Sequence, residues 1–296
     1  MGKPKAIVFG ALGLVGQYMA ACLEDSYHVV RSDRRGREGE DVLELDITDH
    51  ESVSSLIDEI GPDLVVNAVN LAGGVDFCET DKVKAKVYHF DVVVNLARGC
   101  RRNDATLVFM STDYIFDGTA GPYSEEAEPN PLNTYGLLKL MSEEYIRRCL
   151  ESHLIVRTTN IYGYDPESPT PNFVTSLLRR LSKGEGVSVP VDQYGNPTLV
   201  NNLVEAICDL LDQGKTGVYN IVGPDWVNRL EWAKAIADIF GFDGDLASGV
   251  ETKDLTQAAF RPLRSGFVLD KVMADLRVEL VGLKAGLEAV KSHQGT

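Results

Sequence analysis

Residues 6–16 read AIVFGALGLVG and place four apolar residues directly before a loop of three glycines. The apolar run predicts a buried strand, and the pattern after it predicts a helix at residues 14–24. Gly10, Gly13 and Gly16 let the backbone turn tightly and approach a pyrophosphate, which binds at a helix N-terminus. The spacing G-x-x-G-x-x-G therefore predicts a dinucleotide-binding unit at the start of the chain.

The alternation of strand and helix continues through the first 160 residues. Further strands are predicted at residues 28–32, 42–46, 64–68, 106–110 and 153–157, and helices at residues 50–60, 82–102 and 134–150. Continuous apolar strands alternating with helices are typical of an α/β fold with a doubly wound parallel sheet.

The last third is more mixed. Prolines at 166, 169 and 171 predict a loop, followed by helices at residues 173–182, 199–212 and 229–240 and a strand at 218–222. We predict a Rossmann-type dinucleotide-binding domain at residues 1–160. A smaller substrate-binding lobe is predicted at residues 161–296, with some segments returning to the main sheet.

Composition limits the classes of partner. The chain has 296 residues and a formal net charge of −15, which would repel phosphate backbones, so we expect no nucleic-acid partner. No apolar run reaches transmembrane length, so we expect no membrane partner and a cytoplasmic location. The five cysteines and five histidines are scattered without metal-ligand spacing, which predicts reduced thiols and no metal site.

Two features after the second predicted strand bear on the cofactor. Asp33 ends that strand, and an aspartate there can bond ribose hydroxyls and favours NAD. Arg34 and Arg35 follow at once and could hold a 2′-phosphate, which favours NADP. NAD and NADP therefore both stay open. The other predicted cofactor contacts lie in the glycine loop and at strand ends: Leu12, Leu14, Val15, Asp46, Ile47 and Ala68.

Residues 111–144 hold the predicted catalytic groups. Ser111 and Thr112 follow an apolar run, and Tyr135 and Lys139 lie four apart on a predicted helix and so share a face. A lysine ammonium beside a phenol favours the phenolate, so we expect a lowered pKa for Tyr135. Together with the Thr112 hydroxyl, these groups could transfer a proton to or from a carbonyl or alcohol.

The glycine loop, the Ser-Thr pair and Tyr-x-x-x-Lys, in that order, resemble the extended short-chain dehydrogenase/reductase superfamily. The segments STDYIFDG (111–118) and PNPLNTYG (129–136) resemble one branch in particular, the dTDP-4-dehydrorhamnose reductases. The resemblance covers nearly the whole chain. It implies NAD(P)H-dependent reduction of a nucleotide-linked 4-keto-6-deoxy sugar, and a possible homodimer.

The resemblance also implies roles for single residues. Tyr135 would protonate the carbonyl oxygen, Lys139 would bind the nicotinamide ribose, and Thr112 would hydrogen-bond the reacting oxygen. Further substrate contacts are implied for Val75, Asp113, Tyr114, Phe116, Asn160 and Arg261, the last reaching the nucleotide diphosphate.

Two positions depart from the pattern of the branch. Asn160 stands where relatives usually carry a tryptophan near the substrate, which leaves the identity of the sugar open. Asp91 stands where the superfamily often has an asparagine, and its carboxylate would either alter the proton relay or face solvent.

Two alternative functions stay open. An epimerase or dehydratase would use the same fold and groups, but dehydratases often carry an Asp-Glu pair after the threonine, and here Asp113 is followed by Tyr114. A non-catalytic dinucleotide-binding subunit, like the β subunit of methionine adenosyltransferase, would fit the unusual pair Gly73-Gly74. The intact Thr112, Tyr135 and Lys139 argue against it.

Overall fold

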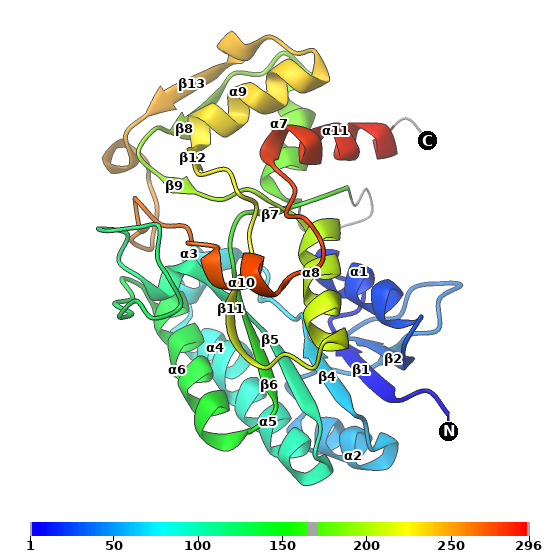
Figure 1. Cartoon of the computed structure of the whole chain (residues 1–296). Coiled ribbons are helices and arrows are strands. Elements are labelled where there is room, and N and C mark those ends of the chain that lie inside the picture. The colour runs from blue at the N-terminus through cyan, green and yellow to red at the C-terminus, as the bar shows by residue number, and fades with distance from the viewer. Residues whose placement is uncertain (1, 165–170, 295–296) are drawn as a thin grey trace.

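A parallel sheet of seven strands forms the centre of the computed structural model, which describes residues 2–164 and 171–294 (Figure 1). The strands are β1 (Lys5–Phe9), β2 (His28–Asp33), β3 (Leu43–Glu44), β4 (Leu64–Asn67), β5 (Thr106–Thr112), β6 (His153–Thr158) and β11 (Gly217–Asn220). They lie in the order β11-β6-β5-β4-β1-β2-β3. The chain order reverses between β1 and β4, and in such sheets ligands bind beyond the carboxyl ends of the strands at this point.

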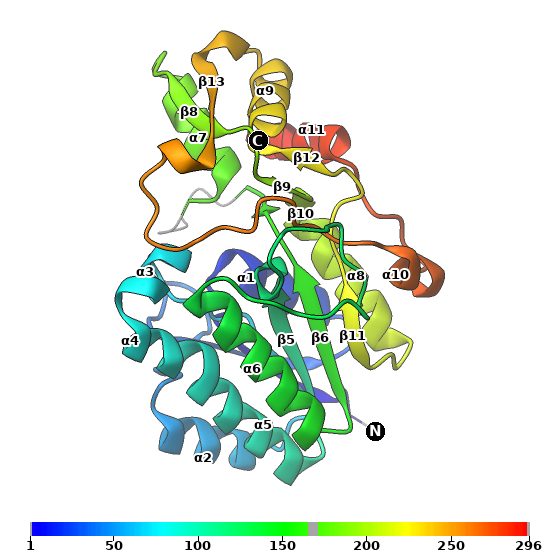
Figure 2. The same ribbon diagram turned by 90° about the vertical axis from the view of Figure 1, so that its left-hand side faces the viewer.

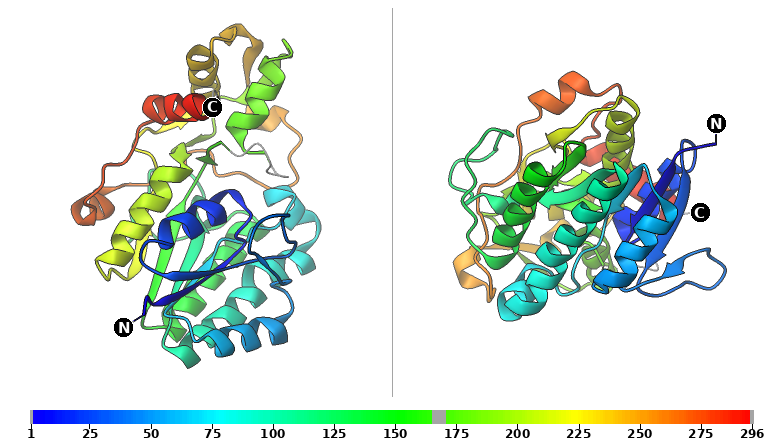
Figure 3. Two further views of the ribbon diagram at one scale, coloured as in Figure 1. Left: turned by 90° about the vertical axis from the view of Figure 1, so that its right-hand side faces the viewer. Right: turned by 90° about the horizontal axis from the view of Figure 1, so that it is seen from below.

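Helices cover both faces of the sheet. On one face lie α1 (Leu14–Leu23) and α8 (Val200–Asp212), seen in the left panel of Figure 3. On the other lie α2 (His50–Ile60), α5 (Val92–Asn103) and α6 (Thr134–Cys149), in front of the sheet in Figure 2. An apolar core lies between the sheet and the helices on each face. Alternate side chains of β1 point into one core and the other, which explains its continuous apolar run. The predicted doubly wound fold is confirmed.

A third apolar core lies at the top of Figure 1. It is built from α7 (Phe173–Leu181), α9 (Arg229–Phe240) and α11 (Leu283–Gln294) with β8 (Val187–Pro190) and β13 (Ala247–Val250). Trp232 is fully buried there, against Tyr162 and Phe173. This separate core is consistent with a second lobe, and the boundaries 1–160 and 161–296 stay a prediction.

Several short elements lack a periodic sequence signal and were not predicted. They include α3 (Gly74–Thr80), β7 (Ile161–Tyr162), β9 (Tyr194–Gly195), β10 (Thr198–Leu199), β12 (Val227–Asn228) and α10 (Asp270–Asp275). The predicted strand at 42–46 shrinks to β3, because this edge of the sheet is exposed. Of the predicted proline loop, Pro166 and Pro169 lie outside the described residues. None of the described helices is long and apolar enough to cross a membrane.

The single helix predicted at residues 82–102 is wrong. The chain forms α4 (Lys82–Lys86), then one π-helical turn at Val87–Asp91, and then α5. A π turn holds one more residue than an α turn, so it changes which side chains face the sheet and α6.

Candidate active site

The predicted site residues gather at the carboxyl edge of the sheet. Because its strands are parallel, the residues that follow them meet at one edge. Gly10 follows β1, Asp33 ends β2, Ala68 follows β4 and Thr112 ends β5. The amide of Gly10 donates to the carbonyl of Ser32, and that of Ala68 to Phe9, so backbone hydrogen bonds join neighbouring strand ends.

The glycine loop leaves room only for backbone. A Cβ atom on Gly16 would lie 1.9 Å from the carbonyl oxygen of Gly10, so α1 packs directly against the loop. The amide of Gly13 closes the turn by donating to the same carbonyl at 3.0 Å. Gly13 is the N-cap of α1 and offers no side-chain cap, so the first turn, with Leu14 and Val15, presents amides. This arrangement fits the pyrophosphate of a dinucleotide.

The ribose and adenine contacts predicted from the sequence lie beside this loop. The Asp33 carboxylate accepts hydrogen bonds from the amides of Leu12 at 3.1 Å and Arg34 at 2.7 Å, which fixes it next to the loop. The Arg34 side chain is exposed. Asp46 accepts two bonds from Thr48 and stays exposed, whereas Ile47 is buried in the core.

Thr112 lies at the tip of β5, where the chain enters a 3-10 turn at Asp113–Ile115. Its hydroxyl donates to the Asp113 carboxylate at 3.2 Å and accepts from the amide of Tyr114. Asp113 is buried and also accepts a bond from Ser265, a residue that sequence reasoning did not assign. Burial raises the pKa of Asp113 above its ordinary value.

Asn133 and Gly136 explain how the sequence places Tyr135. The Asn133 side chain caps α6 by accepting from the amide of Gly136 at 2.9 Å, so Tyr135 falls in the first turn. A Cβ on Gly136 would lie 2.0 Å from the carbonyl oxygen of Tyr114, so only glycine permits this approach. The rings of Tyr135 and Tyr114 consequently meet edge to face, 5.8 Å apart. The segment PNPLNTYG thus holds α6 against the end of β5.

Lys139 lies one turn after Tyr135 and is buried. Its ammonium donates to the carbonyl of Met110 at 2.7 Å and lies 5.8 Å from the Tyr135 ring centre. Burial is the largest cause that raises the pKa of Tyr135 well above its ordinary value, and the negative charge of Asp113 raises it further. A hydrogen bond with Thr112 lowers the pKa by a smaller amount. The expected lowering of this pKa is therefore wrong, because burial and the charge of Asp113 outweigh the hydrogen bond with Thr112. A neutral phenol is the form that a proton donor needs.

The buried Lys139 predicts how activity depends on pH. Burial lowers its pKa to about 8, so the ammonium charge is present below that pH and is lost above it. We expect kcat/KM for the reduced cofactor, which reports the free enzyme, to fall as the pH rises through about 8. The substitution Lys139→Arg keeps its charge and should move this fall to higher pH. A flat profile for the unmodified protein up to about pH 9.5 would contradict the assignment.

The π turn brings His89, rather than Asp91, to Tyr135. The two rings meet edge to face at 5.1 Å, and burial lowers the pKa of His89 to about 3. Asp91 instead pairs with Lys86 at 2.5 Å and is partly exposed. Of the two readings of Asp91, the structure therefore favours the one that faces solvent. The sequence contains no periodic signal that tells whether His89 or Asp91 faces Tyr135. The extra residue of the π turn sets which of the two does.

Ser111 bonds a later part of α6 rather than Thr112 or Tyr135. Its hydroxyl donates to Glu143, which pairs with Arg157 at 2.7 Å. The side chains of Arg157 and Glu143 are only 3% and 1% exposed. These three residues join β5 and β6 to α6 and so support the helix that carries Tyr135.

The remaining predicted substrate residues differ in their surroundings. Phe116 is fully buried and stacks on Tyr123, so it lies in the core behind the site and we leave it out of the proposed contacts. Val75 is partly exposed in the first turn of α3, whose N-cap is Gly73 and whose first residue is Gly74, both at positive φ. Arg261 pairs with Asp76 in the same turn at 2.8 Å and lies 5.9 Å from the Tyr114 ring.

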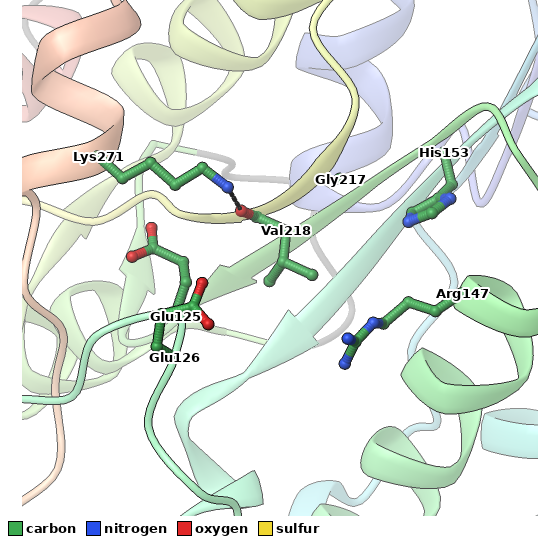
Figure 4. A pocket seen from close by; sticks show the side chains of 7 residues that line it. All are labelled: Glu125, Glu126, Arg147, His153, Gly217, Val218 and Lys271. Carbon is green, nitrogen blue, oxygen red and sulfur yellow. Dashed lines mark hydrogen bonds between the residues drawn. The ribbon is translucent and has the colours of Figure 1, made fainter.

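Figure 4 shows a separate surface hollow of about 300 Å³. It lies where β6 and β11 begin, at the amino edge of the sheet, and Lys271 there donates to the carbonyl of Val218 at 2.6 Å. Its lining contains no predicted site residue: Glu125, Glu126, Arg147, His153, Gly217, Val218 and Lys271. Among residues 2–164 and 171–294, no cluster of His, Cys, Asp and Glu could hold a metal ion.

Comparison with known proteins identifies the family. The RmlD substrate binding domain family matches residues 4–294. The chain belongs to this family. The predicted resemblance is confirmed, and dTDP-4-dehydrorhamnose reductases occur among the relatives of this RmlD-family chain.

Three of these relatives are informative. A dTDP-4-dehydrorhamnose reductase of Streptomyces griseus is 32% identical over 279 residues, covering 91% of this chain and 86% of that protein. A Haloferax volcanii protein named "probable low-salt glycan biosynthesis reductase" is 30% identical and covers 97% of both chains. The crystal structure of dTDP-4-dehydrorhamnose reductase from Bacillus anthracis in complex with NADP has 27% identity and a TM-score of 0.89, covering 99% of this chain and 100% of that one. RmlD-family similarity therefore extends over the whole length.

Proposed function

We propose that this chain is an NAD(P)H-dependent reductase of a nucleotide-linked 4-keto-6-deoxy sugar. The observation that carries the proposal is the meeting of Thr112, Tyr135 and Lys139 at the carboxyl edge of the sheet, beside the glycine loop. The names of the family relatives support the same reaction. The absence of a glutamate after Asp113 favours reduction over dehydration.

When bound, the nicotinamide supplies hydride to the keto carbon. Tyr135 then donates its phenolic proton to the carbonyl oxygen as negative charge develops there. The Thr112 hydroxyl, which donates to Asp113 in the structure, turns its single proton to the same oxygen when substrate binds and lowers the energy of the developing charge. Lys139, held by the carbonyl of Met110, supplies a positive charge beside the phenolate that Tyr135 becomes. The fixed start of α6 keeps these groups in place before substrate binds.

The proposal is tested by mixing the purified protein with NADH or NADPH and a panel of dTDP-, GDP- and UDP-linked 4-keto sugars. Loss of the reduced-cofactor absorbance with one sugar is the expected result. Conversion of a sugar without consumption of cofactor would indicate the epimerase alternative. No conversion of any sugar, with a stable hetero-complex instead, would favour the regulatory-subunit alternative.

Arg34 gives a prediction about the cofactor. Its exposed side chain follows Asp33, and no described carboxylate pairs with it. If Arg34 holds a 2′-phosphate, Arg34→Ala should raise KM for NADPH by roughly tenfold and leave KM for NADH unchanged. Arg35→Ala shows whether Arg35, the other arginine predicted to hold the 2′-phosphate, shares the contact. Equal KM values for NADPH in all three proteins would contradict this contact.

A homodimer stays a prediction. Leu137 and Met141 lie four apart on the outer side of α6, 48% and 36% exposed, and Leu132 precedes them at 42%. Apolar side chains gathered on one exposed face are typical of an interface. Leu137→Glu should therefore convert a dimer to a monomer in light scattering, whereas a monomeric parent protein would contradict the prediction. The cytoplasmic location also stays a prediction.

A further inference from the structure

Arg229 carries a charge that the proposed mechanism does not use. It is the first residue of α9, and its guanidinium lies 5.0 Å from the Phe173 ring and 5.1 Å from the Trp232 ring. Burial lowers the pKa of Arg229 below its ordinary value. Within the described parts of the chain, no carboxylate lies within ion-pair distance of it. Arg229 is partly buried, and the charge of Asp113 acts on it only from farther away, so the site has room for an incoming anion.

Asn160 makes this region rich in hydrogen-bond donors. The Arg229 guanidinium donates to the Asn160 side-chain oxygen at 2.6 Å, and this bond sets the orientation of the amide. The Asn160 amide group then has only N–H donors left, and no described acceptor bonds to them. A Cβ on Gly195 would lie 2.6 Å from the amide nitrogen, so the glycine leaves space for it. Donors from two side chains without an acceptor fit an oxyanion.

The donors lie near Asp113, because a Cβ on Gly195 would lie 2.6 Å from the Asn160 amide nitrogen and 3.9 Å from the Ser265 hydroxyl, which donates to Asp113. Arg229 and Arg261 both act electrostatically on Tyr114, which follows Thr112 by two residues. Arg261 already pairs with Asp76 at 2.8 Å, whereas Arg229 interacts with the charge of Asp113 but has no carboxylate at ion-pair distance among the described residues. In a nucleotide sugar, the two phosphate charges are attached directly to the sugar. An anion beside the sugar end of the site is therefore most simply the diphosphate.

We propose that Arg229 and the amide of Asn160 bind the diphosphate of the nucleotide sugar. The proposal rests on the proposed function and deepens it by naming a contact for the substrate. Phe173 and Trp232 hold the planar guanidinium in place before binding, which reduces the entropy lost when the diphosphate arrives. It also gives Asn160 a role as a substrate contact.

Binding of nucleotides without turnover tests the proposal. The full-length protein is saturated with NADP⁺, so that probes cannot enter the cofactor site, and titrated calorimetrically with dTDP, UDP and GDP and with their nucleosides. The diphosphate that binds most tightly is then compared in Arg229→Met and Arg229→Lys. We expect Arg229→Met to weaken the diphosphate by roughly tenfold or more and to leave the nucleoside unchanged, with Arg229→Lys intermediate. Arg180→Met, on neighbouring α7, is the control of equal charge change, because Arg180 is 48% exposed.

Three results would overturn the proposal. They are an unchanged diphosphate affinity in Arg229→Met, an equal loss of diphosphate and nucleoside affinity, and no diphosphate binding by the unmodified protein. If Arg229→Met does not fold, Arg229→Lys alone decides, because it keeps the charge but not the paired donors. A protein that binds the diphosphate through Arg229 but reduces no 4-keto sugar would contradict the proposed function and leave this contact standing.

Discussion

Replacing Tyr135 by phenylalanine is expected to lower kcat by a factor of roughly 10² to 10⁴, the range attributed to a positioned general acid. The substitution removes only the phenolic O–H. The ring keeps its edge-to-face contacts with Tyr114 and His89, and the N-terminal cap of α6 by Asn133 is unaffected. The measurement is steady-state reduction of the 4-keto sugar identified in the panel.

Two controls separate chemistry from structure. The dissociation constant of NADPH, measured by fluorescence titration, should change little in Tyr135→Phe. Tyr145→Phe makes the same chemical change on the same helix, in a side chain that packs against Phe90 away from the site, and should keep normal turnover. Near-normal kcat in Tyr135→Phe would contradict the assigned proton donor.

The parts of the fold that were predicted correctly depend on local pattern. β1 and β4 are continuous apolar runs because the sheet is buried on both faces, and this signal lies within four or five residues. Tyr135 and Lys139 were found in the same way, since helical spacing alone places them on one face.

The parts that were missed depend on tertiary structure. His89 reaches Tyr135 because a π turn adds one residue, and no periodicity in the sequence indicates that turn. Asn160 was predicted as a substrate contact, but its partner Arg229, 69 residues away, was not, because the two meet only where α9 and the chain after β6 pack together. The raised pKa of Tyr135 follows from burial, which sequence spacing does not reveal. Chemistry set by helix geometry was thus predictable, whereas chemistry set by packing was not.

Breaking the buried ion pair between Arg157 and Glu143 should have the largest effect on stability. We expect Arg157→Met to lower the free energy of unfolding by about 3–5 kcal/mol, because it leaves the Glu143 carboxylate buried without its cation. Arg157 also donates to the carbonyl of Glu125, so that acceptor loses its partner too. Urea unfolding followed by circular dichroism measures the loss.

An exposed ion pair provides the matched control. Arg102 and Asp58 pair at 2.9 Å with side chains 46% and 48% exposed, so Arg102→Met should cost only about 0–1 kcal/mol. Replacing both buried partners, as Arg157→Met with Glu143→Leu, should restore much of the loss, since no charge is then left unpaired. Equal losses of unfolding free energy in Arg157→Met and Arg102→Met would contradict the view that burial of the ion pair sets the size of the loss. Because the buried pair joins β6 to α6, Arg157→Met should also lower kcat by loosening the helix that positions Tyr135 and Lys139.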